Sequence, residues 1–141
     1  MNQQAGHDLK ARISEEMTLD YSSALEKNFD LAKQFIGITK AGRVDILIKD
    51  RLNGEEQVLL YLIGKLYAKE VGYTATEEVP NKELLGELGI PEGSLLPWLK
   101  DLRDTNKIRQ VKRGRYTYHL IPPNLVERTL KSVEKKITKS T

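Results

Sequence analysis

The chain has 141 residues, no cysteine and a formal net charge of +3. This length suits one domain with a real hydrophobic core, and a sequence without cysteine excludes disulfides and thiolate zinc sites. Because the first residues are polar and no apolar run approaches about 18 residues, neither a signal peptide nor a membrane span is predicted, and we expect a soluble, cytoplasmic protein.

Charge is distributed unevenly along the chain. Residues 99–141 carry 12 basic and 4 acidic side chains, a net charge of +8, so residues 1–98 carry 11 basic and 16 acidic ones, a net charge of −5. This asymmetry favours contact between the C-terminal third and a polyanion such as a phosphate backbone. A solvated lysine-rich tail would give the same composition, so the skew alone does not identify a partner.

The N-terminal third is predicted to form a long helix followed by a short strand. We expect residues 1–7 to be a flexible terminus. Apolar residues then recur every three or four positions over residues 9–36, and Asp8 is placed to cap this long amphipathic helix. Such a helix is longer than a small core requires, so part of its apolar stripe should meet another element or another chain. Alternating apolar residues over 44–48 predict a strand with one buried face, and residues 8–53 become a candidate dimerisation extension.

Three helices are predicted in the middle of the chain. The helix over 55–71 has the strongest apolar face and two glutamates at its start, which suit the helix dipole. After a loop over 72–80, Asn81 can cap a helix over 82–88. Gly89 then allows a tight exit and Ile90 can fill the corner before the helix over 94–104.

Two prolines set the expected start of this third helix. Proline lacks an N–H and its ring clashes with the carbonyl four residues back, so a regular helix should not run from Pro91 through Pro97. We expect the helix to begin near Gly93 or Ser94, which places Pro97 close to the first turn, where a donor is least missed. Asn106 is expected to end the helix.

A basic hairpin and a last helix complete the chain. Residues 108–121 contain two β-prone segments joined by the turn Lys112-Arg113-Gly114-Arg115, and the following prolines stop the second strand. Residues 122–141 are expected to form a C-terminal helix capped by Asn124. Its apolar residues repeat as a heptad-like seam; they are Val126, Leu130, Val133 and Ile137.

The order of these elements resembles the winged helix-turn-helix superfamily over about residues 54–121. The segment from Asn81 to Ser94, NKELLGELGIPEGS, is similar to the middle of many bacterial and archaeal winged-helix regulators. The resemblance implies a mainly α fold with a small β-wing, to which this chain adds a long N-terminal helix and a C-terminal helix. It also implies that the second helix of the motif enters the major groove and that the wing reaches the backbone or the minor groove.

Carried onto this sequence, the resemblance predicts a set of DNA-binding residues on the second helix and the wing. They are Ser94, Lys100, Arg103, Arg109, Lys112, Arg113 and Arg115. The same helix surface carries Glu92, Leu96 and Pro97, which offer few donors to bases or phosphates. We therefore expect limited sequence readout by the helix, and weak, salt-dependent binding led by contacts between the wing and phosphates.

Residues typical of catalysis or metal binding are scarce. The chain has only two histidines, His7 and His119, so neither a metal triad nor a Cys/His pair can be built. The sequence has no glycine-rich phosphate loop and no dinucleotide fingerprint. We expect no enzyme, no metal and no cofactor.

Two functions stay open. The first is a DNA-binding transcriptional regulator that acts as a homodimer, joined through helix 9–36, through the C-terminal seam, or through both. The second is a winged-helix module for protein interactions, in which exposed Leu96 and Pro97 contact a protein partner. The basic wing favours the first function, and the neutral-to-acidic face of the helix favours the second.

Overall fold

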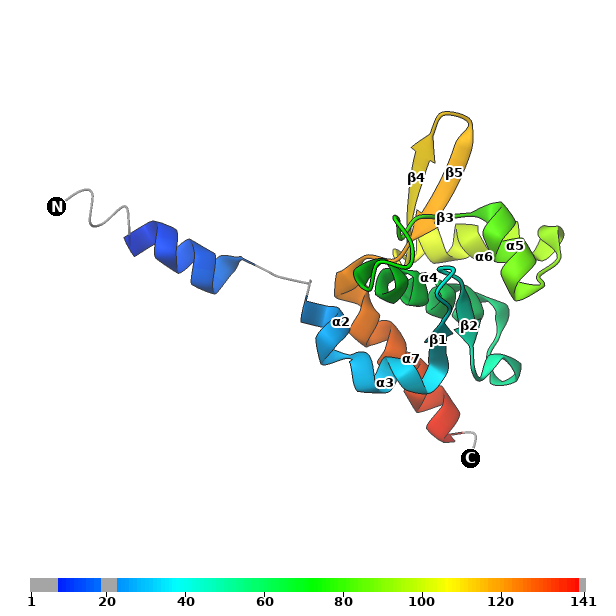
Figure 1. The fold of residues 1–141 in the computed structure, drawn as a ribbon, viewed down its shortest axis with the longest axis horizontal. Helices are drawn as coiled ribbons and strands as arrows, with labels where there is room; N and C mark the ends of the chain where they lie inside the picture. The colour runs from blue at the N-terminus through cyan, green and yellow to red at the C-terminus, as the bar shows by residue number, and fades with distance from the viewer. Residues whose placement is uncertain (1–7, 19–22, 140–141) are drawn as a thin grey trace.

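The computed structural model describes residues 8–18 and 23–139, and residues 1–7, expected to be a flexible terminus, lie outside them. The described chain is mainly helical, with two small antiparallel sheets (Figure 1). Its elements are η1 (Ile13–Met17), α2 (Ala24–Lys27), α3 (Phe29–Phe35), β1 (Ile36–Ile38), β2 (Val44–Ile46), η3 (Lys49–Arg51), α4 (Gly54–Glu70), β3 (Val79–Pro80), α5 (Asn81–Leu88), α6 (Glu92–Asp104), β4 (Arg109–Arg113), β5 (Tyr116–Leu120), η4 (Pro123–Leu125) and α7 (Val126–Lys139).

Helix α4 is the centre of the core, as its apolar face predicts. Its side chains are buried on nearly every side between Val58 and Leu66, and the other elements pack around it. Asn53 accepts a hydrogen bond from the backbone N–H of Glu56, and the Glu56 carboxylate accepts one from the backbone N–H of Asn53, both at 2.9 Å. This capping box satisfies donors that the first turn would otherwise leave exposed, and it fixes the start of the helix within one residue of the predicted position.

The predicted helix over 9–36 is wrong as a continuous element. Residues 8–12 are helical, so Asp8 lies inside this segment rather than at its cap, and the π-helix η1 then ends at Thr18. The chain resumes as α2, turns at Asn28 and continues as α3. The Asn28 amide donates to the Ala24 carbonyl at 2.8 Å, a local bond that competes with a continuous helix.

A second correction follows at residues 36–38, which form a strand instead of the end of that helix. Strand β1 pairs antiparallel with β2, and Ile36 lies opposite Ile46. Two isoleucines that alternate around a glycine pack well in a strand, so pairing with the confirmed strand β2 overrides the helical spacing. The hairpin lies against α4 at Gly64, where an added Cβ would lie 2.4 Å from a Val44 methyl carbon.

Helices α5 and α6 meet at a tight corner, as predicted. Gly89 has φ +64°, the left-handed conformation that ends α5, and Ile90 is buried in the corner. At the end of α6, Asn106 has φ +59° and the Lys107 N–H donates to the Leu102 carbonyl at 2.8 Å. This arrangement is a Schellman motif, so Asn106 ends the helix as expected.

Two expectations for these helices are wrong. Asn81 is the first residue of α5 and makes no capping bond, because its side chain is engaged elsewhere. Helix α6 begins at Glu92, so Pro97 is its sixth residue and lies beyond the first turn. The missing N–H of Pro97 leaves the Gly93 carbonyl without its helical partner. Both residues are exposed, so water can hydrate that carbonyl.

The predicted basic hairpin is confirmed, and it pairs with a third strand that was not predicted. Strands β4 and β5 pair antiparallel, and Gly114 in the turn has φ +64°. Strand β3, at the end of the expected loop over 72–80, pairs with β5 and gives the order β3-β5-β4. Since β3 leads directly into α5, the hairpin and α5 belong to one hydrogen-bonded unit.

Helix α7 covers the core from the other side. It follows η4, which contains Asn124, so this residue does not cap α7. The heptad-like seam faces the chain's own core, where Val126, Leu130 and Val133 are buried and Ile137 is half-buried. The seam is therefore unavailable for dimerisation, in contrast to one of the two predicted modes. Within residues 8–18 and 23–139, none of the helices has the length and apolarity needed to cross a membrane.

Candidate nucleic-acid interface

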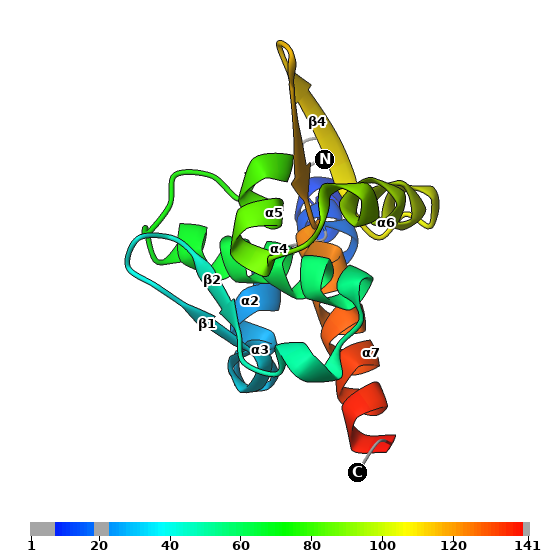
Figure 2. The ribbon, with the colours of Figure 1, turned by 90° about the vertical axis from the view of Figure 1, so that its right-hand side faces the viewer.

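The β4-β5 hairpin and α6 present neighbouring surfaces. Figure 2 shows the hairpin above α5 and α6, whereas α7 runs downward, away from it. On α6, Glu92, Gly93, Leu96, Pro97 and Lys100 are exposed, and Ser94 and Arg103 are half-buried. The structure thus brings together the two groups of residues that the sequence predicts, but their side chains are not equally available.

Arg113 is already paired within the chain. Its Nε and Nη2 donate to the two carboxylate oxygens of Glu78, at 2.7 and 2.6 Å. This bidentate hydrogen bonding lowers the pKa of the Glu78 carboxyl and raises the pKa of Arg113. A phosphate would have to compete with Glu78 for this guanidinium. The pair could not be predicted from spacing, because Glu78 lies 35 residues away in a segment expected to be a loop.

Lys100 and Arg103 on α6 also have neighbours. Lys100 Nζ lies 2.8 Å from an Asp104 carboxylate oxygen, one turn further along the helix, and this hydrogen bond lowers the pKa of Asp104. The charge of the half-buried Arg103 acts on the same Asp104 carboxylate and also helps to lower its pKa. The α6 surface therefore offers little unopposed positive charge to a phosphate backbone.

Three predicted cations remain free on the hairpin. The side chains of Arg109, Lys112 and Arg115 are exposed, and they form no hydrogen bond or ion pair with any residue in the part of the chain that the structure describes. Tyr116, next to Arg115, exposes 62% of its surface. The hairpin thus displays three unpaired positive charges and one exposed aromatic ring.

The root of the hairpin is fixed by a buried histidine. His119 on β5 is only 1% exposed, and its Nε2 lies 2.6 Å from the Asn81 Oδ1 at the start of α5. Burial, with a smaller contribution from the charge of Arg103, lowers the pKa of His119 to about 4. The ring is therefore neutral at pH 7 and donates from Nε2, whereas Nδ1 has no partner. His119 fixes the hairpin to α5 and is not placed to act on a ligand.

A second buried polar cluster surrounds Glu83. Its Oε2 accepts a hydrogen bond from the Tyr61 hydroxyl at 2.5 Å and lies 3.2 Å from Lys65 Nζ, and its Oε1 lies 2.9 Å from Arg43 Nη1. Burial and the neighbouring carboxylate raise the pKa of Tyr61 well above its usual range. Because both carboxylate oxygens are paired, the cluster connects the β1-β2 turn to α4 and α5.

Among the described residues, no group of histidine and carboxylate side chains could hold a metal ion. Comparison with protein-family models, with curated proteins and with solved structures finds no match to this chain.

Proposed function

We propose that the protein binds double-stranded DNA and acts as a transcriptional regulator in the cytoplasm, with phosphate contacts led by the β4-β5 hairpin. The observation that carries the proposal is the set of unpaired cations on this hairpin, Arg109, Lys112 and Arg115, next to the exposed face of α6. The order α4, α5, Gly89 turn, α6 and hairpin supports the resemblance to winged helix-turn-helix proteins, in which a helix enters the major groove and the wing contacts the backbone.

Sequence readout through α6 is expected to be limited. The exposed face of the helix carries a carboxylate at Glu92, an apolar side chain at Leu96 and a proline at position 97. Base edges are read mainly by donors and acceptors such as Arg, Asn and Gln, and Lys100 is paired with Asp104. Binding should therefore depend strongly on salt and weakly on sequence.

The test measures affinity for a random duplex as a function of salt concentration. The double variant Lys112→Ala, Arg115→Ala should weaken binding and reduce the slope of log K against log salt by about 1.8, since each lost phosphate contact removes about 0.9. The matched control is Lys40→Ala, Lys135→Ala, which removes two exposed charges from the β1-β2 turn and from α7, neither of them paired with a residue in the described ranges. Equal effects of both pairs, or no duplex binding by the wild type at low salt, would reject the proposal.

We also propose a homodimer that is formed through the N-terminal region. Leu9, Ile13 and Met17, at intervals of four residues, are 56%, 43% and 72% exposed on a helical segment that extends away from the body (Figure 1). The body in turn carries an apolar groove of about 440 Å³ between α3, β1 and the end of α4, lined by Phe29, Ile36, Ile38, Tyr67 and Val71 among others. Insertion of each N-terminal helix into the groove of the other copy would bury both surfaces and double the number of hairpins that face DNA.

The alternative function is the binding of a protein partner through α6. Leu96 is 53% exposed beside Pro97, and an exposed leucine on a helix face suits a protein contact better than a DNA groove. If the wild type binds no duplex, this patch becomes the favoured site. Leu96→Asp should then abolish partner capture and leave the far-UV circular dichroism spectrum unchanged.

A further inference from the structure

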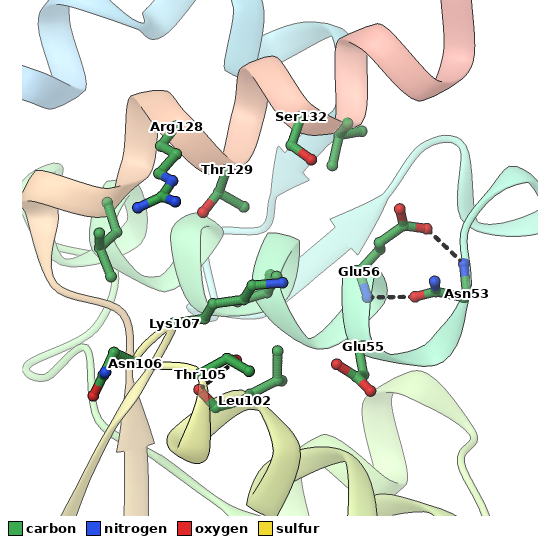
Figure 3. A pocket seen from close by; sticks show the side chains of 13 residues that line it. Asn53, Glu55, Glu56, Leu102, Thr105, Asn106, Lys107, Arg128, Thr129 and Ser132 are labelled. Carbon is green, nitrogen blue, oxygen red and sulfur yellow. Dashed lines mark hydrogen bonds between the residues drawn. The ribbon is translucent and has the colours of Figure 1, made fainter. Parts of the chain in front are cut away.

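A cavity of about 340 Å³ lies on the side of the core where α7 crosses α4 and α6 (Figure 3). Its walls are the start of α4, the end of α6 with the following turn, and the N-terminal half of α7 with the last residue of η4. A volume of this size suits a small organic molecule. Of the residues that connect α6 to β4, those up to Lys107 line the cavity. None of the three free hairpin cations lines it.

One end of the cavity is rich in hydrogen-bond donors. Lys107 and Arg128 line it together with the hydroxyl groups of Thr129 and Ser132, and Figure 3 shows Arg128, Thr129 and Ser132 along α7 with Lys107 reaching across from below. None of these four side chains forms a hydrogen bond or ion pair with a residue of the described ranges 8–18 and 23–139. The Lys107 charge also acts on the Glu55 carboxylate across the cavity, whereas Arg128, Thr129 and Ser132 have no such neighbour among those residues, so this donor-rich side is suited to an anion.

The opposite end of the cavity carries two carboxylates that already have partners within the chain. Glu56 takes part in the capping box with Asn53, and its Oε1 lies 2.5 Å from Lys136 Nζ. Glu55 is partly buried next to Asp101, and both effects raise the pKa of its carboxyl group. In Figure 3, Glu55 and Asn53 lie on the far side of the cavity from Arg128. This polarity places the negative group of a ligand at the α7 end, away from the two carboxylates.

The wall between the two ends is apolar. Leu102 and Val133 lie behind it in the core with almost no exposed surface, so Leu59 and the half-buried Leu125 present the apolar surface to the cavity. A hydrated inorganic ion would leave this wall uncovered, whereas a hydrocarbon or aromatic body would cover it. The occupant therefore needs an apolar part as well as a charge.

We propose that this cavity binds a small organic anion with an apolar body, such as a medium-chain carboxylate. Arg128 and Lys107 bind its carboxylate, Ser132 and Thr129 donate to its oxygens, and the hydrocarbon chain lies on Leu59 and Leu125. The proposal does not depend on DNA binding, because it concerns another side of the molecule.

The probe is octanoate, and the reporters are amide chemical shifts and the fluorescence of Trp98. Trp98 is the only tryptophan, and its ring packs on Gly54, next to the cavity residues Asn53 and Glu55. We expect saturable changes in the amide shifts of Thr129, Ser132 and Lys107. The double variant Lys107→Gln, Arg128→Gln should weaken octanoate at least tenfold. Lys135→Gln, an exposed lysine of α7 outside the cavity, should leave the affinity unchanged.

A second variant and two further probes complete the test. Ser132→Leu places a side chain in the cavity mouth without touching the core, and it should also abolish octanoate binding. Neutral 1-octanol and inorganic phosphate should each bind at least tenfold more weakly than octanoate, because each provides only one half of the required chemistry. Equal affinity for either of them, shifts that map to the groove at Phe29, or no effect of the double variant would overturn the proposal.

Discussion

At the scale of single residues, the charge that a side chain presents depends on its partners more than on its type. Arg113 and Lys112 are adjacent in the hairpin and look equivalent in the sequence. The structure pairs Arg113 with Glu78 and leaves Lys112 free. A basic patch read from sequence alone therefore overestimates the positive charge available to DNA.

This pairing leads to a gain-of-function prediction. Glu78→Ala should release Arg113, tighten binding to random duplex DNA severalfold and steepen the slope of log K against log salt by about 0.9, the value of one added phosphate contact. Glu77→Ala is the matched control, because it removes a neighbouring carboxylate that is paired with Lys69 at 2.8 Å on the end of α4. Fluorescence anisotropy over a salt series measures both variants. Identical slopes for Glu78→Ala and the control would contradict the prediction.

His119 should make stability depend on pH. Its pKa is about 4 in the folded protein, against 6.5 for a free histidine, so the unfolded chain binds the proton more readily. The contribution of His119 to the free energy of unfolding is therefore fully present above pH 6.5. It is lost as the pH falls from 6.5 towards 4, by up to about 3 kcal/mol. Urea unfolding between pH 5 and 7, where most carboxylates stay ionised, measures this loss. His119→Gln should flatten the curve in that window, and an unchanged pH dependence in the variant would contradict the prediction.

At the scale of elements, the space around a backbone position decides which substitutions that position tolerates. The β1-β2 hairpin lies so close to α4 at Gly64 that an added Cβ would lie 2.4 Å from Val44. Gly64→Ala should lower the free energy of unfolding by about 2 kcal/mol, as expected for overpacking. Gly86→Ala in α5 is the control, because an added Cβ there has no atom within 4 Å. It should stabilise by about 0.5 to 1 kcal/mol. Urea unfolding that shows the same sign for both variants would contradict this account.

Pro97 gives a second prediction at this scale. It lies inside α6 and leaves the exposed Gly93 carbonyl without an N–H donor. Pro97→Ala restores the donor and removes the ring clash, a gain that is partly offset by the greater freedom of the unfolded chain. The net effect should be a stabilisation of about 1 to 2 kcal/mol, measured by urea unfolding. A destabilised variant would show that the proline ring contributes to packing in the folded state.

The sequence predicted the elements whose signals are local. Helix α4 has a continuous apolar face, Gly89 and Asn106 mark helix ends, and Gly114 marks the hairpin turn. Elements that depend on distant pairing were not predictable in this way. Ile36 and Ile38 continue a helical spacing and become a strand only because β2 pairs with them, and Val79 becomes a strand only because β5 lies beside it.

The candidate site shows the same division. Exposure of Lys100, Leu96 and Pro97 on α6 follows from helical periodicity, and the structure bears it out. The pairing of Arg113 with Glu78 joins residues from different elements, so no spacing rule reveals it. The cavity between α4, α6 and α7 likewise brings together three segments that are separated by long stretches of chain.

At the scale of the whole molecule, the exposed N-terminal stripe predicts self-association. Replacement of Leu9 and Ile13 by serine should convert a dimer into a monomer, because it removes most of the apolar surface proposed to enter the groove. Phe29→Ser should have the same effect from the groove side. Lys10→Ser, on the same helix, is the control. Sedimentation velocity measures the state, and a monomeric wild type would show that each helix folds back onto its own groove or stays free.

The strand order β3-β5-β4 affects how the protein binds a partner. Strand β3 leads directly into α5, the pair of Arg113 with Glu78 joins β4 to the residue before β3, and His119 joins β5 to α5. The hairpin therefore cannot swing independently of the helices, and its distance from α6 is set when the chain folds. Little conformational entropy remains to be lost at the moment of contact. The encounter with a long polyanion should then be governed by electrostatic steering and diffusion, without a slow ordering step.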